Sequence, residues 1–322
     1  MYRLVAPLFL TCETPLHAGA GQDLGIVDLP IQRERVTSFP KVEASGLKGS
    51  LREQFAAVKQ MPEAQVNVLF GPEEVSDSTA HMGALGFTDA RMLLFPMRSM
   101  KGVFAWVTCP DVLARLYRDL AWAAEQNANR ALQALPSIPK AGTVTSSSIL
   151  VHENKMVVLD EYAVSVVSDP AVDKWASWLR EWVMPDEARK EAIAQRLVVV
   201  DNDTFRDLVT FQTEVVTRVR IDNQKGTVQR GGLFTEEYLP TESVLYSLVM
   251  AAPPFIEERS LSDAVSVMKT FVAHLPKVFQ LGGNATLGKG LVRTQILWRE
   301  EEQAGGKGGS ATGGPAPGES GV

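Results

Sequence analysis

Residues 14–21, Thr-Pro-Leu-His-Ala-Gly-Ala-Gly, form a glycine-rich loop that directly follows an apolar stretch at residues 3–12. The apolar stretch predicts a buried or edge strand that leads into the loop. The motif Gly19-x-Gly21-x3-Gly25 resembles a dinucleotide-binding turn in its spacing only, because Pro30 breaks the helix that such a turn requires. The loop instead presents Asp28 on an exposed segment.

A helix is expected downstream of this loop, starting at Ser45-Gly46-Leu47-Lys48-Gly49. Ser45 is a typical helix N-cap, and helical spacing is kept by Leu47, Leu51, Phe55 and Val58. Lys48 and Arg52 lie one turn apart near the free amides of the helix start. This arrangement predicts an anion site suited to phosphate.

A second glycine loop, Gly282-Gly283-Asn284-Ala285-Thr286-Leu287-Gly288-Lys289-Gly290, lies near the C-terminus. It differs from a phosphate-binding P-loop because Gly290 stands where a Ser or Thr would hold magnesium. The predicted order is also helix, loop and strand, whereas a P-loop needs strand, loop and helix. The exposed amides of this loop and Lys289 remain suited to an RNA backbone.

The remaining patterns predict a chain that mixes helices and strands. Strands are expected at 84–95, 101–108 and 291–298, and helices at about 111–135, within 170–195 and at 262–279. Segment 215–238 predicts a hairpin that turns at 222–226. On its first strand Val219 and Ile221 share one face, whereas Arg218 and Arg220 share the other.

Composition limits the classes of function. The 322 residues are 45% hydrophobic and 22% charged, as in ordinary globular proteins, and no apolar run is long enough for a membrane span. A net charge of -6 disfavours a uniformly basic nucleic-acid binder. Cations nevertheless cluster between residues 217 and 233, where Asp222 is the only acid against Arg218, Arg220, Lys225 and Arg230.

The cysteine and histidine content excludes further classes. Two cysteines, Cys12 and Cys109, and an N-terminus without a signal peptide predict a cytoplasmic protein with no disulfide framework. The four histidines and two cysteines are scattered without the spacing of zinc ligands.

Together these motifs resemble the RAMP superfamily of CRISPR effector proteins. The first loop, the stretch Gly46-Leu47-Lys48-Gly49-Ser50-Leu51-Arg52 and the second glycine loop are most similar to those of the repeating backbone subunit of type III-B (Cmr) complexes. The resemblance spans residues 1 to about 299, and the middle of the chain matches only in general layout.

The resemblance implies an α+β fold, with a ferredoxin-like, RRM-like palm, an inserted helical subdomain and a protruding β-hairpin thumb. It implies one domain over residues 1–302. Within that domain the palm is expected at 1–110 and 255–299, the helical insertion at about 111–200 and the thumb at about 215–240. The glycine-rich residues 303–322 are expected to form a disordered tail.

The same resemblance implies a CRISPR RNA-binding subunit that cleaves target RNA at regular intervals, with one active site per copy. Asp28 matches the aspartate that the family requires for cutting, and it would bind Mg²⁺ or Mn²⁺ or orient the RNA 2′-hydroxyl. His17 and Glu237 are further catalytic candidates, with Glu236 one residue away from the second. The expected RNA-binding residues are Lys48, Arg52, Arg218, Arg220, Lys225, Arg230, Gly282, Gly283 and Lys289.

The implied partners are CRISPR RNA, complementary target RNA, further copies of the chain in a filament and other Cmr subunits, with no membrane. Three other functions remain open. The first is a catalytically silent subunit that only holds guide RNA. The second is a metal-independent nuclease that processes the CRISPR precursor with His17 as base. The third is an unrelated α/β enzyme that binds a nucleotide. Gly290, in place of Ser or Thr, disfavours the last of these.

Overall fold

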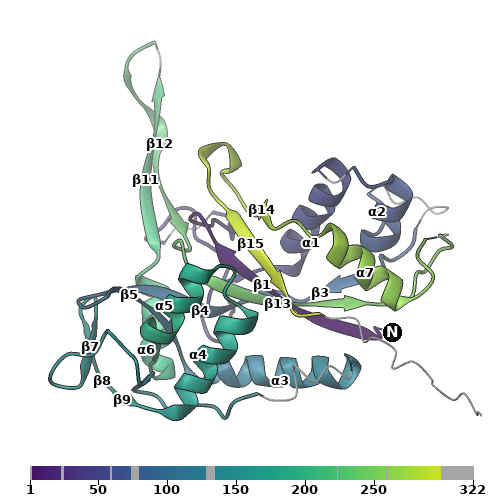
Figure 1. Cartoon of the computed structure of the whole chain (residues 1–322). Helices are drawn as coiled ribbons and strands as arrows, with labels where there is room; N and C mark the ends of the chain where they lie inside the picture. The colour runs from purple at the N-terminus through teal and green to yellow at the C-terminus, as the bar shows by residue number, and fades with distance from the viewer. Residues whose placement is uncertain are drawn as a thin grey trace, which may run out of the picture.

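The structure is a computed structural model that describes residues 2–22, 25–58, 60–73, 80–127, 135–222, 224–258 and 260–298. At its centre β1 (Leu4–Cys12) pairs antiparallel with β13 (Val244–Ala251) on one side and with β15 (Leu291–Ile296) on the other. β13 also pairs antiparallel with β4 (Ala90–Ser99). All of β1 except Leu4 is buried, because helices cover both faces of the sheet here (Figure 1).

The order of these elements confirms the ferredoxin-like palm. Along the chain come β1, α1 (Ala44–Glu53), β4, β13, α7 (Ala264–His274) and β15, and the four strands lie in the order β15-β1-β13-β4. In Figure 1, α1, α7 and α2 (Glu63–Phe70) lie on one side of the sheet and α3 (Pro110–Asn127) on the other. Short strands β2 (Lys41–Val42), β3 (Leu85–Phe87) and β14 (Val278–Gln280) pair with β4, β13 and β15.

Two expectations about the palm are wrong. Because β13 lies in its centre, the second palm segment begins at Val244 and not at 255. The helix start also differs, since α1 begins at Ala44, one residue before Ser45. The amide of Ala44 donates to Oδ1 of Asp89 (3.0 Å), so a side chain from a distant loop caps this helix in place of Ser45.

The inserted subdomain contains strands as well as helices. α4 (Pro170–Trp182), α5 (Glu187–Arg196) and α6 (Asn202–Phe211) each follow an aspartate whose carboxylate accepts a hydrogen bond from the first turn. β10 (Leu197–Val199) pairs with β5 (Val103–Thr108) and continues the palm sheet to β6 (Thr143–Val144) and β9 (Val167–Ser168). β7 (Met156–Leu159) and β8 (Tyr162–Ser165) form a hairpin. The helical insertion expected over about 111–200 therefore also contains short strands, and strands of two to four residues are too short to show an alternating pattern in the sequence.

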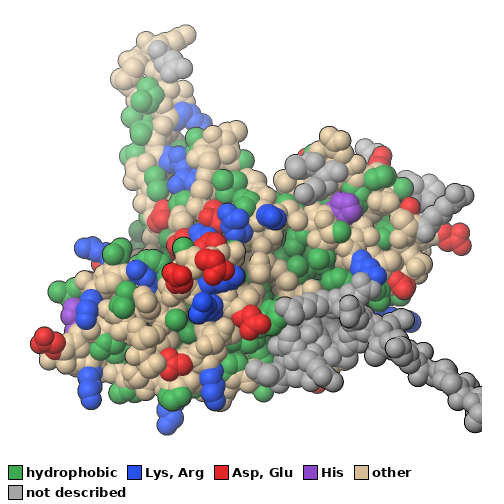
Figure 2. Space-filling model, in the orientation of Figure 1, with side chains coloured by type: hydrophobic (Ala, Val, Ile, Leu, Met, Phe, Trp, Pro, Cys, Tyr) green, Lys and Arg blue, Asp and Glu red, His purple; other side chains and the backbone are tan. Residues whose placement is uncertain are grey.

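The predicted hairpin is confirmed. β11 (Glu214–Asp222) and β12 (Thr227–Tyr238) form a separate two-stranded sheet, called the thumb here, that projects from the body (Figure 1). Val219, Ile221 and Leu233 are more than half exposed on it. Figure 2 shows hydrophobic side chains along one edge of the thumb and basic side chains along the other.

Residues 303–322 lie outside the described part of the chain, so the expected disordered tail stays a prediction. Within the described ranges, none of the helices has the length and apolar character that crossing a membrane requires.

Candidate active site

The first glycine loop is attached to three successive residues of β12: Thr235, Glu236 and Glu237. The amide of Leu29 donates to the carbonyl oxygen of Thr235 (3.0 Å), and the amide of Glu237 donates to the carbonyl oxygen of Leu29 (3.0 Å). The loop segment thus lies beside β12 as a short parallel pairing. Because side chains alternate along a strand, Thr235 and Glu237 face one side of β12 and Glu236 faces the other.

Asp28 is exposed at this junction. Its Oδ2 accepts hydrogen bonds from the amide (2.7 Å) and the hydroxyl (2.9 Å) of Thr235. The amide, and then the hydroxyl, lower the pKa of the Asp28 carboxyl, so the group is ionised at neutral pH. A surface hollow of about 740 Å³ adjoins it, lined by Gln22, Asp28, Leu29, Arg220, Gly231, Leu233 and Phe234.

His17 lies on the opposite face of β12 and is almost entirely buried. Its Nδ1 is 2.7 Å from the carbonyl oxygen of Glu237, and its Nε2 is 3.6 Å from Oε1 of Glu236. The second glycine loop closes over it, because the amide of Gly283 donates to the His17 carbonyl oxygen (2.9 Å). His17 therefore joins the two glycine loops to the base of the thumb.

Glu236 is the centre of a polar cluster on the His17 face. Its Oε2 accepts from Nε of Arg218 (2.7 Å) and from the hydroxyl of Tyr238 (2.5 Å), and its Oε1 accepts from Nδ2 of Asn284 (2.6 Å). Burial would raise the pKa of Glu236, but the hydrogen bonds from Tyr238, Asn284 and Arg218 outweigh it and lower the pKa. Nζ of Lys289 lies 5.0 Å from the ring centroid of Tyr238, so a predicted RNA-binding lysine reaches the same cluster.

Glu237 has a different set of partners from Glu236. Its carboxylate forms an ion pair with Arg33 and accepts hydrogen bonds from the hydroxyl of Thr213 (2.7 Å) and the amide of Ile31 (3.0 Å). The side chain is buried. These contacts anchor the segment after Asp28 to the thumb, and Glu236, not Glu237, is the acid that approaches the His17 ring.

Lys48 and Arg52 make their contacts elsewhere in the palm. Nζ of Lys48 donates to the carbonyl oxygen of Leu85 in β3 (3.1 Å), and burial lowers the pKa of this amine. Arg52 joins α1 to α2 through Oδ1 of Asn67 (3.0 Å). The structure therefore does not bring these two cations to the base of the thumb.

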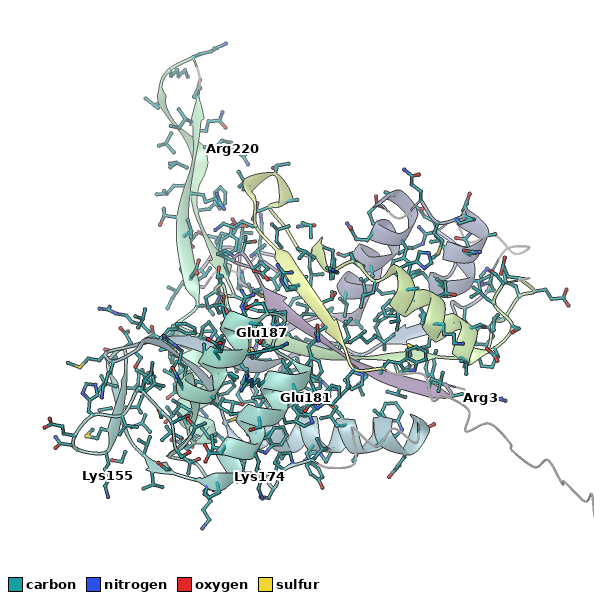
Figure 3. All side chains as sticks on the ribbon, in the orientation of Figure 1. Arg3, Lys155, Lys174, Glu181, Glu187 and Arg220 are labelled. Atoms are coloured by element: carbon teal, nitrogen blue, oxygen red, sulfur yellow. The ribbon has the colours of Figure 1, made fainter. Side chains whose placement is uncertain are left out.

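The thumb cations are distributed along the hairpin. Arg218 is bonded to Glu236, whereas Arg220 is exposed and lines the hollow beside Asp28. Figure 3 shows Arg220 partway along the thumb, clear of the body of the protein. Lys225 is exposed in the turn, and Arg230 belongs to β12 by its backbone, while its side chain lies outside what the structure describes.

Comparison with known proteins places this arrangement in a family. The sequence model of the RAMP superfamily matches residues 9–293. The chain belongs to the RAMP superfamily. A curated relative, the CRISPR system Cmr endoribonuclease Cmr4 of Pyrococcus furiosus, is 36% identical to this RAMP protein over 286 residues, which are 88% of this chain and 92% of the relative. The CRISPR system CMR subunit Cmr4 of Saccharolobus solfataricus is 24% identical over 314 residues, or 92% and 97% of the two chains.

Solved structures of RAMP proteins share this fold. The crystal structure of oligomeric Cmr4 from Pyrococcus furiosus superposes with a TM-score of 0.69 at 30% identity, covering 92% of this chain and 98% of that chain. A chain of the type III-B Cmr-beta complex bound to cognate target RNA gives a TM-score of 0.72 at 20% identity, with the same coverage of both chains, and shows likeness of fold.

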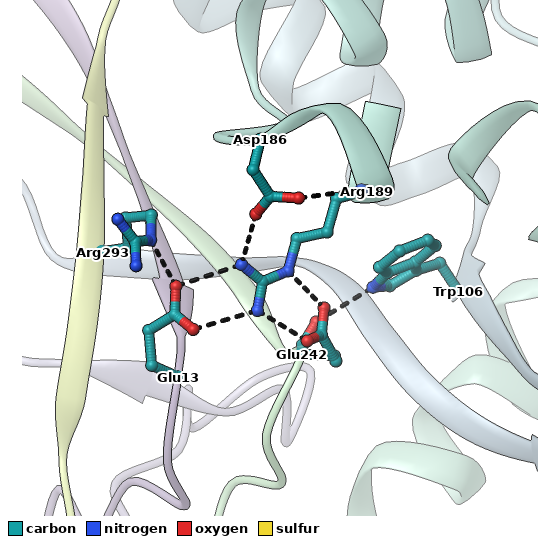
Figure 4. A network of polar contacts seen from close by, with 6 residues as sticks. All are labelled: Glu13, Trp106, Asp186, Arg189, Glu242 and Arg293. Carbon is teal, nitrogen blue, oxygen red and sulfur yellow. Dashed lines mark hydrogen bonds and ion pairs between the residues drawn. The ribbon is translucent and has the colours of Figure 1, made fainter. Parts of the chain in front are cut away.

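One further network joins the insertion of this RAMP protein to its palm (Figure 4). The guanidinium of Arg189 in α5 pairs with Glu13 at the end of β1 (3.0 Å), with Glu242 between β12 and β13 (2.6 Å) and with Asp186 (2.8 Å). Arg293 of β15 also pairs with Glu13. Because Glu13 directly precedes the first glycine loop and Arg293 follows the second, this network links the ends of both loops to α5 of the insertion.

Proposed function

We propose that this RAMP protein is the guide-RNA-binding backbone subunit of a type III-B CRISPR complex and that it cleaves target RNA within that complex, with one active site per copy. Its 36% identity to a protein named a Cmr endoribonuclease, over most of both chains, supports this proposal. The observation that carries it is the ionised, exposed Asp28, which lies beside a hollow that Arg220 also lines at the base of the thumb.

In the proposed reaction the RNA supplies its own nucleophile. The 2′-hydroxyl loses its proton to solvent as its oxygen forms a bond to the adjacent phosphorus, and the 5′-oxygen takes a proton from solvent as its bond to phosphorus breaks, which leaves a cyclic phosphate and a 5′-hydroxyl. Because hydrogen bonding lowers its pKa, Asp28 is suited to orient the 2′-hydroxyl or bind a cation, and poorly suited to retain a proton. The thumb holds the backbone in line for the attack, and Arg220 offsets charge on the phosphate.

A divalent cation, Mg²⁺ or Mn²⁺, is part of the proposal. Both hydrogen bonds from Thr235 go to Oδ2 of Asp28, which leaves Oδ1 without a hydrogen bond from Thr235. A carboxylate oxygen is a ligand that Mg²⁺ prefers, and Mg²⁺ is commonly held by one or two carboxylates together with substrate phosphates. The described ranges contain no group of three His, Cys, Asp or Glu side chains able to hold a metal, so the proposed ion relies on Asp28 and the RNA. It would stabilise negative charge at the phosphate.

The second glycine loop, Lys289 and the thumb cations are proposed to hold the RNA backbone without reading its sequence. Specificity then comes from base pairing between guide and target. Copies of the chain are proposed to assemble along the guide, together with other subunits of the complex.

The test compares guide-loaded complexes that contain the wild-type chain, Asp28→Asn or, as a control, Asp203→Asn, which changes an exposed aspartate of α6. Cleavage at regular intervals by wild type and Asp203→Asn is expected, whereas Asp28→Asn should bind guide and target without cutting. EDTA should stop wild-type cleavage. Normal cutting by Asp28→Asn would contradict the assignment of this site, and cutting that survives EDTA but is lost in His17→Ala would favour the metal-independent nuclease.

A further inference from the structure

We propose that Thr235 is the positioning residue of the Asp28 carboxylate, so that the base of the thumb sets the orientation of the cleaving group. This inference rests on the proposed function, in which Asp28 acts on RNA.

The hydroxyl of Thr235 is fully engaged with Asp28. Oγ1 of Thr235 donates to Oδ2 of Asp28 (2.9 Å) and accepts from the backbone amide of Asp28 (3.0 Å). The backbone amide of Thr235 donates to the same Oδ2 (2.7 Å). Because a hydroxyl has a single proton to donate, this contact uses its whole donor capacity on Asp28. The carboxylate cannot turn about its terminal bond without losing two hydrogen bonds, and Oδ1 is kept as the oxygen free to meet RNA or a cation.

The loop backbone has attachments to β12 besides the bond from the Asp28 amide to this hydroxyl. Two backbone hydrogen bonds, from Leu29 to Thr235 and from Glu237 to Leu29, already attach the loop to β12. Glu237 adds its ion pair with Arg33. Removal of the hydroxyl should therefore leave the loop in place and leave the amide of Thr235 as the remaining Thr235 donor to the carboxylate, so that the exposed side chain of Asp28 is held in one rotamer less firmly.

This contact also couples the position of the Asp28 carboxylate to that of the thumb. Thr235 belongs to β12, which pairs with β11 in a sheet separate from that of the palm. The carboxylate therefore follows any displacement of the thumb base when RNA is engaged. A misplacement of about 1 Å can reduce a rate by about 100-fold, so the orientation of this side chain is a sensitive variable.

The experiment uses guide-loaded complexes with Thr235→Val, Thr235→Ser, Thr217→Val or Asp28→Asn, and it measures single-turnover cleavage and target affinity separately. Valine preserves the shape and strand preference of threonine while it removes the hydroxyl. Thr217 is the matched control, because it pairs directly with Thr235 across the hairpin and lies on the same face.

Thr235→Val should lower the cleavage rate by about 10- to 100-fold, with target affinity close to that of wild type. Thr235→Ser should restore cleavage, since serine retains the hydroxyl, and Thr217→Val should behave as wild type. Wild-type cleavage by Thr235→Val, while Asp28→Asn is inactive, would overturn the role of Thr235 alone. A loss that serine does not restore, or one that Thr217→Val shares, would assign Thr235 a purely structural role. Active Asp28→Asn would instead overturn the proposed function and this inference with it.

Discussion

Gly282 lies so close to His17 that a Cβ atom at position 282 would stand 2.3 Å from the His17 carbonyl oxygen. That same oxygen accepts the amide of Gly283. Gly290 is similarly confined, since a Cβ there would lie 2.1 Å from the carbonyl oxygen of Leu281. The second glycine loop is thus closely packed against the first. At Gly282 and Gly290 a larger residue is excluded both by the nearby carbonyl oxygens and by the positive φ of the backbone.

Gly282→Ala should destabilise the protein more than Gly288→Ala. Both glycines have positive φ (76° and 69°), so alanine strains both backbones by about 1 kcal/mol. A Cβ at Gly288 meets nothing within 4 Å, whereas at Gly282 it collides with His17, which adds about 1–3 kcal/mol. Urea unfolding at pH 7 measures the difference, and retention of guide RNA should fall only in Gly282→Ala. Equal stabilities for the two variants would refute this account of the loop.

Glu237→Gln should lower stability and leave chemistry intact. The substitution leaves the Arg33 guanidinium without its buried partner charge, which costs about 3 kcal/mol. The contacts of Glu237 are all structural, so cleavage per folded molecule should stay near that of wild type in the assembled complex. Glu187→Gln, on an exposed part of α5, is the control for charge removal. If Glu237→Gln folded normally but did not cut, Glu237 would be a catalytic residue as the sequence predicts.

Arg189→Met should uncouple the insertion from the palm in a pH-dependent way. Burial would raise the pKa of Glu13, but hydrogen bonds from Arg189 and Arg293 outweigh it and lower the pKa below the usual value of 4.5. A carboxyl with a lowered folded-state pKa stabilises the fold above its unfolded pKa, and this stabilisation is lost as pH falls through the folded pKa. The variant should therefore lose about 3 kcal/mol at pH 7 and less below about pH 4.

Denaturant unfolding of Arg189→Met and wild type at both pH values tests this. Lys190→Met is the control, because the ion-pair partner of Lys190 among the described residues is the exposed Glu187 on the same helix. A stability deficit that does not change with pH would show that lost packing, and not the ion pairs, is responsible.

Shortening the thumb should disturb cleavage far more than folding. Replacement of residues 221–231 by a two-residue turn removes side chains that are largely exposed where the structure describes them, from a sheet separate from that of the palm. The melting temperature should shift by no more than about 4 °C, because little apolar area is lost from the core. Mapping of cut sites on a long target should show irregular or absent cleavage. A collapse of the melting temperature would mean that the hairpin supports the body of the protein.

The sequence predicts those elements whose patterns are local. The hairpin at 215–238, the helices within 170–195 and the first strand are all present. Segment 244–251 could not be assigned, because β13 is buried on both faces and shows no alternation. Lys48 and Arg52 do share a helix face, but the sequence does not show that this face packs against β3 and α2.

In the candidate site too, the sequence shows local patterns but not the contacts between residues far apart in the chain. Asp28 is a candidate because its loop resembles that of the family, yet its contact with Thr235 joins residues 207 positions apart and leaves no local signal. The alternation of a strand places Glu236 and Glu237 on opposite faces. Only the folded chain shows that His17 occupies the Glu236 face.

Because the thumb forms a sheet separate from the palm, the length of the hairpin can change without a change in the residues at its base. Among the described residues, the hydrogen bonds that the thumb makes to the two glycine loops come from residues 235–238 at its base. Since side chains alternate with a period of two, adding or removing one pair of residues on each strand near the tip preserves every facing at the base. Adding or removing a single residue in β12 between the tip and Thr235 would instead turn the side chains beyond that point to the opposite face of the hairpin, relative to the base. We therefore expect hairpin length to vary in steps of two residues per strand. Such a change would alter where the thumb contacts a long RNA and would leave Asp28 and its neighbours as they are.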